Sequence, residues 1–171
     1  MQPECPRLKL GLASMRPDAH LNATTHTFSV TVLSAHAGKP AVPAELQGLA
    51  PINNATDKKI ADAITHLQKS VDATIWADDM RPKVGKADTV FNEEKATVKA
   101  LAQITNPSPA LAAKILAWSG ALLTADRSIA ATAIAEGGTA RDLAKGDTDR
   151  SNGNFDTAID HYKNAWKALK D

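Results

Sequence analysis

The sequence predicts an all-α protein, a bundle of four to five helices with an extended, partly β N-terminal arm. Alanine, the best helix former and a poor strand former, is the most frequent residue, whereas aromatic residues make up only 4% of the chain. Six of the nine prolines fall within residues 1–51, and none follows Pro109. Because proline interrupts helices, we place the arm at residues 1–54 and the bundle at residues 55–171.

The arm contains one strand signal, at about residues 26–33. Phe28, Val30 and Val32 alternate there with hydroxyl side chains, which is typical of a strand with one apolar face. A single strand is not stable alone, so it must pair with another N-terminal segment, a second molecule or a domain outside this chain. Pairing with a second molecule would produce a homodimer through the arm.

The bundle is expected to begin with a helix capped at Asn54 or Thr56. Its apolar residues recur every three or four positions: Ile60, Ile64, Leu67, Val71 and Ile75. A loop then covers about residues 77–85, with Trp76 just before it, and a second helix spans about residues 86–104.

The third helix is expected to be long and central. Ser108 is its predicted N-cap and Pro109 lies in its first turn, while Gly137 and Gly138 end it. A glycine inside a helix costs about 1 kcal/mol relative to alanine, so Gly120 predicts the close approach of a neighbour. Two shorter helices, at about residues 140–150 and 154–169, complete the bundle.

The last two helices resemble a single tetratricopeptide repeat over about residues 138–170. The matching positions are Gly146, Gly153, Phe155, Ala158, Tyr162 and Ala165. Asp142 and Asp149, however, stand where that repeat has large apolar or aromatic residues, and no second copy precedes them. Repeat arrays need neighbouring copies to bury their faces, so the pattern predicts one repeat-like hairpin inside a bundle.

A wider resemblance covers about residues 26–168. It combines the predicted strand with four segments and the final aromatic helix; the segments are Ile64-Thr-His-Leu-Gln-Lys-Ser70, Trp76-Ala-Asp78, Val90-Phe-Asn-Glu-Glu94 and Thr124-Ala-Asp-Arg-Ser-Ile-Ala130. In this order they are similar to the all-helical segment that closes large bacterial secreted or surface proteins after their Ig-like repeats. The resemblance implies an extracellular or cell-surface location and a module of a larger protein. It implies no assigned chemistry.

Charge and composition exclude several classes of function. The net charge of +1 lacks the electrostatic footprint of a nucleic-acid-binding protein. The single cysteine, Cys5, excludes an internal disulfide and a cysteine-based zinc cluster. No apolar run has the length of a membrane span, and the first residues lack the apolar core of a signal peptide. We therefore expect no nucleic-acid partner, no membrane span and no signal peptide in this chain.

We also expect no metal site and no cofactor. The five histidines show no helical ligand spacing, and the chain has no phosphate loop, dinucleotide fingerprint or hydrolase elbow. The acidic turn that begins at Asp147 has the composition of a calcium loop. Counted from Asp147, however, the twelfth position, where such a loop needs an acid, is Ala158. A capped turn between two helices is the favoured interpretation.

Two functions remain open. The first is a non-enzymatic interaction or structural module of a bacterial exported protein, in which Trp76, Tyr162 and Trp166 contact a protein or a polysaccharide. The alternative is a small carboxylate-based hydrolase acting on a polysaccharide, with Glu94 as acid and Asp78 as base or nucleophile. Such hydrolysis needs two carboxyl groups roughly 5 to 10 Å apart. A cleft holding both acids beside Trp76 would favour the hydrolase.

Overall fold

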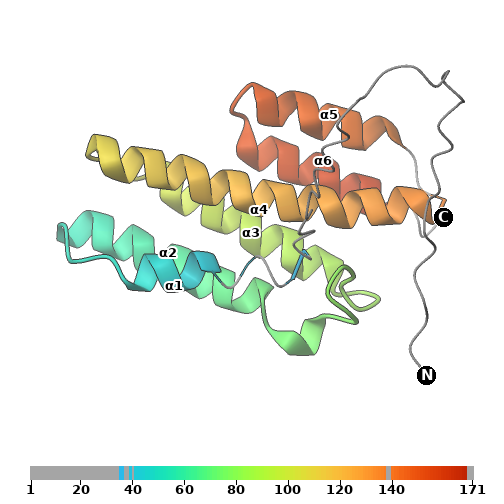
Figure 1. The fold of residues 1–171 in the computed structure, drawn as a ribbon, viewed down its shortest axis with the longest axis horizontal. Coiled ribbons are helices and arrows are strands. Elements are labelled where there is room, and N and C mark those ends of the chain that lie inside the picture. The colour runs from blue at the N-terminus through green and yellow to red at the C-terminus, as the bar shows by residue number, and fades with distance from the viewer. Residues whose placement is uncertain (1–34, 37–38, 40, 138–139, 169–171) are drawn as a thin grey trace, which may run out of the picture. The chain divides into compact units, whose positions relative to one another are not determined.

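A computed structural model describes residues 35–36, 39, 41–137 and 140–168 (Figure 1), and all of them belong to one compact unit, Val32–Asp171. This part of the chain is helical and contains no strand, apart from an isolated antiparallel bridge between Trp76 and Pro82. The predicted all-α class is confirmed for these residues. The strand predicted at residues 26–33 lies outside them.

Six α-helices and one short 3-10 helix follow one another in the described residues. They are α1 (Ala41–Gln47), α2 (Asn54–Ser70), η1 (Ala73–Ile75), α3 (Ala87–Ala102), α4 (Pro109–Ala135), α5 (Ala140–Ser151) and α6 (Phe155–Lys167). Helix α2 packs against α1 and α3, whereas α6 packs against α3, α4 and α5. Figure 1 shows α4 as the longest helix of this arrangement. Helix α6 therefore connects the C-terminal hairpin to the rest of the bundle.

Local capping explains where α2 and α4 begin. The side chain of Asn53 accepts a hydrogen bond from the backbone N–H of Thr56 at 2.9 Å, one residue before α2 starts. The side chain of Ser108 accepts one from Leu111 at 3.2 Å, and Pro109 occupies the first turn of α4 as the sequence predicts.

Helix α1 was not predicted, because it lies in the proline-rich residues assigned to the arm. Pro43 falls in the first turn of α1, where a backbone N–H has no acceptor within the helix, so proline is tolerated there. Val42 and Leu46 are buried in the same core as the later helices. The bundle therefore begins before the predicted boundary at residue 54, and its described part holds one helix more than expected.

The core contains charged side chains among apolar ones. Its largest fully buried apolar and aromatic side chains are Tyr162, Phe91, Leu46, Leu67, Leu101, Leu122, Leu123, Ile129 and Ile159. Lys39, Glu94 and Asp126 are buried with them. Charged side chains are rarely buried without a partner, so these three require a specific explanation, which their mutual contacts provide below.

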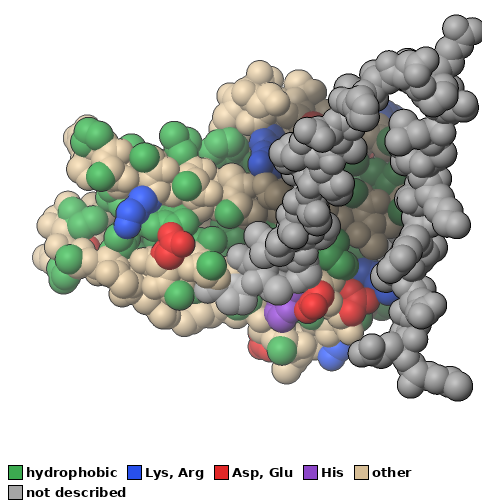
Figure 2. Space-filling model, in the orientation of Figure 1, with side chains coloured by type: hydrophobic (Ala, Val, Ile, Leu, Met, Phe, Trp, Pro, Cys, Tyr) green, Lys and Arg blue, Asp and Glu red, His purple; other side chains and the backbone are tan. Residues whose placement is uncertain are grey.

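The surface carries mixed charge. On the face drawn in Figure 2, acidic and basic side chains of the described residues are scattered among apolar ones. The large apolar side chains most exposed in the described ranges are Ile52, Val84 and Leu116. None of the helices α1 to α6 has the combination of length and apolarity that crossing a membrane requires.

Two helix glycines differ sharply in their surroundings. At Gly120 no atom beyond its own stretch of helix lies within 4 Å of the position that a Cβ would take, so no neighbour packs into the space of the missing side chain, although Nη2 of Arg150 lies 3.4 Å from the Gly120 carbonyl oxygen. At Gly146 a Cβ would lie 2.4 Å from Cε1 of Tyr162. The close approach in this bundle is therefore between α5 and α6, at a residue whose missing side chain leaves room for the tyrosine ring.

Gly146→Ala is expected to destabilise the protein by about 1–3 kcal/mol, because the added methyl group overpacks the contact with Tyr162. Gly120→Ala is the matched control: it also places alanine inside a helix, in open space, and should stabilise by up to about 1 kcal/mol. Urea unfolding followed by circular dichroism measures both changes. Equal effects of the two substitutions would contradict the packing described here.

Candidate functional site

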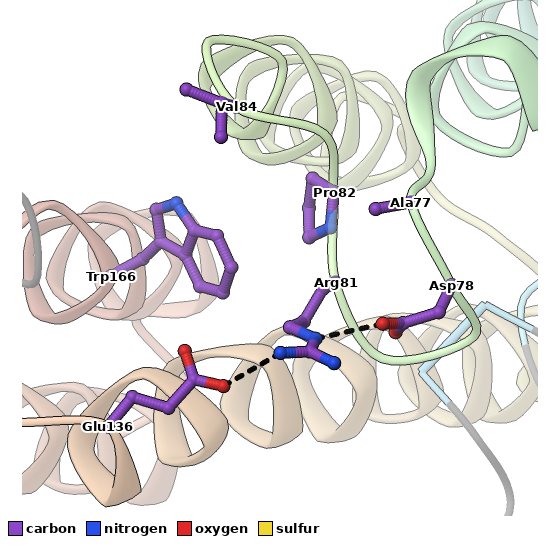
Figure 3. Close-up of a pocket in the computed structure, with 7 residues that line it drawn as sticks. All are labelled: Ala77, Asp78, Arg81, Pro82, Val84, Glu136 and Trp166. Carbon is purple, nitrogen blue, oxygen red and sulfur yellow. Dashed lines mark hydrogen bonds and ion pairs between the residues drawn. The ribbon is translucent and has the colours of Figure 1, made fainter.

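A pocket of about 410 Å³ lies where the loop after η1 meets the end of α4 and helix α6. Its lining residues are Ala77, Asp78, Arg81, Pro82, Val84, Glu136 and Trp166. Figure 3 shows the indole of Trp166 on one side, with Pro82 and Val84 across from it and the charged side chains along the lower edge. The volume lies in the range of ligand-binding pockets in proteins.

The loop that forms one wall is held by its own hydrogen bonds. The backbone N–H of Ala77 donates to the carbonyl of Arg81 at 2.8 Å. The side chain of Asp78 accepts from the backbone N–H of Met80, also at 2.8 Å. This bond, together with the neighbouring Arg81, holds the pKa of Asp78 below its ordinary value. Asp78 is therefore an ionised carboxylate that organises the loop.

Arg81 joins this loop to the end of α4. Its Nε donates to Oδ2 of Asp78 at 2.8 Å, and its Nη1 donates to Oε1 of Glu136 at 2.9 Å. The pKa of Arg81 is raised above its ordinary value, mainly by Asp78 and to a smaller extent by Glu136. Because the guanidinium bonds both carboxylates (Figure 3), the polar edge of the pocket is largely satisfied within the protein, and the facing walls are apolar.

Of the three aromatic residues predicted to bind a ligand, only Trp166 lines this pocket. Trp76 is 5% exposed, and its Nε1 donates to the carbonyl of Ser70 at 2.8 Å. Tyr162 is fully buried. Trp76 and Tyr162 are thus core side chains in this structure and present no surface to a ligand.

Tyr162 belongs to a polar contact between α4, α5 and α6. Its hydroxyl donates to Oδ1 of Asp147 at 3.0 Å, and Arg127 donates to the same carboxylate through Nε at 2.7 Å and Nη2 at 2.9 Å. Arg127 is the main cause that lowers the pKa of Asp147. Burial, with Asp147 as a further cause, raises the pKa of Tyr162 to about 12. Asp147, the first residue of the calcium-like turn, is therefore engaged by the protein's own side chains.

The two acids that depart from the repeat pattern face a histidine. Nδ1 of His161 lies 3.8 Å from Oδ1 of Asp142, and its Nε2 lies 3.3 Å from Oδ2 of Asp149. Here α5 and α6 meet through charged and polar side chains where the tetratricopeptide repeat has apolar ones. Throughout the described ranges, no group of three or more potential ligand side chains has an arrangement that could hold a metal ion.

Glu94 lies in the buried charged cluster, defined here as Lys39, Glu94 and Asp126. Nζ of Lys39 is 2.6 Å from Oε1 of Glu94 and 3.6 Å from Oδ1 of Asp126. Nζ also lies 4.7 Å from the centroid of the Trp76 ring, which covers it. Glu94 is 0% exposed, whereas the side chain of Asp78 is 43% exposed and lines the pocket. The cleft holding both acids beside Trp76, which would have favoured the hydrolase, is not formed.

The protonation of this cluster follows from its surroundings. Burial raises the pKa of Asp126 well above its ordinary value, and the neighbouring Glu94 raises it further. The same surroundings therefore favour the neutral, protonated form of Asp126. With Lys39 and Glu94 as an ion pair and Asp126 neutral, the cluster carries no net charge, which lowers the cost of burying it.

Lys39 and Asp126 were not among the predicted site residues. For Asp126 the sequence contained a signal, since an acid in the middle of the apolar face of a helix needs a partner inside the protein. For Lys39 it contained none, because this lysine belongs to a proline-rich segment without helical periodicity.

Comparisons of this chain with protein-family models, curated proteins and solved structures found no match. The two resemblances described from the sequence therefore stay predictions. The functional argument that follows depends on the pocket, the loop and the buried charged cluster.

The pKa of Tyr162 can be measured directly, because it is the only tyrosine of the chain. We expect it to ionise near pH 12 in the folded protein, compared with about 10 in the unfolded chain. A folded-state pKa above the unfolded value means that this stabilisation is complete below about pH 10 and is lost as the pH rises through about 12.

Near-ultraviolet absorbance, recorded with circular dichroism at each pH, follows the ionisation and confirms that the protein is still folded. Asp147→Asn removes the negative charge beside the hydroxyl and should lower the pKa of Tyr162, though not to its unfolded value, since burial remains. Ionisation of the folded wild type near pH 10 would show that the hydroxyl is not enclosed as described.

Proposed function

We propose that this chain is a non-enzymatic interaction module of a bacterial exported protein, and that the pocket beside Trp166 binds an apolar side chain of a partner protein. The observation that carries the proposal is the apolar wall, in which Trp166 faces Pro82 and Val84. Val84 is 93% exposed, so a large apolar side chain at this pocket lies open to water. Exposed apolar surface next to a tryptophan is typical of protein interaction sites.

A partner side chain fits this pocket better than a sugar does. A sugar ring needs hydrogen-bonding groups beside the aromatic surface, but Arg81 is already bonded to Asp78 and Glu136. An apolar occupant needs no such groups. It would be stabilised by the apolar area removed from water, at roughly 25 cal/mol per Å².

The alternative, a carboxylate-based hydrolase, has less support. Its proposed acid, Glu94, is enclosed with Lys39 and Asp126 and is not exposed to a polysaccharide. Its proposed base or nucleophile, Asp78, has a lowered pKa and is bonded to Arg81 within the loop. Both acids have structural contacts that account for their positions.

The setting of the module is part of the same proposal. The extracellular or cell-surface location follows from the resemblance to the helical segment that closes large bacterial surface proteins. The β part of the arm, at residues 26–33, and a homodimer formed through it are likewise proposed from the sequence pattern.

Two capped amino acids, N-acetyl-leucinamide and N-acetyl-phenylalaninamide, serve as probes of the pocket. We expect both to bind with dissociation constants in the millimolar range, as one buried side chain allows. In ¹H–¹⁵N spectra the shifts should be confined to the Trp166 indole and the amides of residues 77–84. Trp166→Ala should abolish the response, and Val84→Ser should weaken it.

Leu116→Ser is the control variant, because Leu116 is also an exposed apolar side chain, at 59%, but does not line the pocket. It should respond as the wild type does. Cellotriose and chitotriose, tested in parallel, should leave the spectrum unchanged. A response to these sugars alone would contradict the proposal, and so would the absence of any response. Polysaccharide turnover that is lost in Glu94→Gln would favour the hydrolase.

A further inference from the structure

The buried charged cluster has no part in the proposed binding site, yet it brings reactive groups together. Lys39 precedes α1, Glu94 belongs to α3 and Asp126 belongs to α4, and each of the three side chains is at most 1% exposed. The amine nitrogen lies 2.6 Å from one carboxyl oxygen of Glu94 and 3.6 Å from one of Asp126. An amine and two carboxyl groups thus meet in a site that is closed to solvent.

We propose that Lys39 and Asp126 become joined by an amide bond between Nζ and Cγ, with Glu94 carrying the protons. The product is an intramolecular isopeptide cross-link between the segment before α1 and the middle of α4. The reaction is a condensation that releases one water molecule. It needs no oxidant, cofactor or metal.

The three groups together hold the protons that the reaction requires. Asp126 enters as a neutral acid, because burial and Glu94 both raise its pKa. The ammonium of Lys39 passes one proton to the Glu94 carboxylate across their 2.6 Å contact. This leaves a free amine, which is the nucleophilic form of lysine, and it replaces an ion pair by two neutral groups, which a low dielectric favours.

The bond then forms in one addition and one elimination. Nζ of Lys39 attacks Cγ of Asp126, and the carbonyl electron pair moves to the oxygen. Glu94 accepts a proton from the nitrogen and donates a proton to the departing hydroxyl, so that the C–O bond breaks and water leaves. Glu94 finishes the step in the protonated state in which it began. Because folding holds the reacting groups together, the step is unimolecular.

The surroundings favour the amide over the separate charged groups. Although their contacts are short, none of the nitrogen and oxygen atoms of the three side chains makes a well-directed hydrogen bond with the described residues. Burying such charges is costly, and the attraction between them rarely compensates fully. An amide removes the amine and one carboxyl group at once, and it leaves a neutral donor and acceptor beside Glu94.

The condensation also needs the amine to be shielded from water, and Trp76 provides this shielding. Its ring covers Nζ of Lys39, and its own N–H is occupied by the carbonyl of Ser70. The ring therefore excludes water from the amine without offering it a competing hydrogen bond. Exclusion of water matters because amide formation from an acid and an amine is driven backward by bulk water.

Intact mass spectrometry of the purified full chain tests the proposal. The wild type should be lighter than its sequence by the mass of one water molecule, and the deficit should persist in urea. Tandem mass spectrometry of a protease digest should find a branched peptide that links Lys39 to Asp126. Lys39→Arg, Asp126→Ala and Glu94→Gln should each have the full mass of their sequence.

The digest also contains an internal control, the surface pair of Lys95 and Asp160. These side chains are in contact as well, but both are partly exposed to water, and no cross-link is expected there. The wild-type digest decides the question even if the variants fail to fold. A wild type of full mass after prolonged incubation at neutral pH would overturn the proposal, and so would a lost water located at any other residue.

Discussion

Burial of Lys39, Glu94 and Asp126 in one cluster constrains the rest of the described bundle. A buried charge that loses its partner costs about 3–5 kcal/mol, so the segment before α1 and helices α3 and α4 must keep these groups in contact. Trp76, the residue after η1, covers the amine of Lys39, so the position of this part of the chain is tied to the cluster as well. Since that chain continues into the loop of Arg81, the position of the pocket wall depends on the buried cluster.

The shape of the pocket depends on ion pairs between its walls. Its walls come from a loop, the end of α4 and helix α6, and Arg81 connects the first two through Asp78 and Glu136. A site whose walls are fixed before binding spends less of its interaction energy on ordering them. The ion pairs therefore hold the pocket in its shape, while Trp166 and its apolar neighbours provide the surface that would contact a bound side chain.

What the sequence predicts correctly is local. The all-α class, the cap at Ser108 and the loop before α3 each follow from residues that are close along the chain. The fold of α1 and the role of Lys39 depend on partners much further along the chain, which a single sequence does not reveal. The same holds for Gly120, where only the packed helices reveal that no side chain fills the space beside it, whereas Gly146 matched a position of the repeat pattern in the sequence.

Helix α5 is held differently from its neighbours. Gly146 is its only buried residue and Leu143 packs partly buried against the core, so polar contacts also help to hold the helix, among them those of Asp147 with Arg127 and of Asp142 and Asp149 with His161. Attraction between partly exposed charges is screened by dissolved ions, whereas apolar packing is not weakened in this way. Added salt therefore weakens the polar contacts that help to hold α5, and the amide hydrogens of this helix should exchange faster as salt is added.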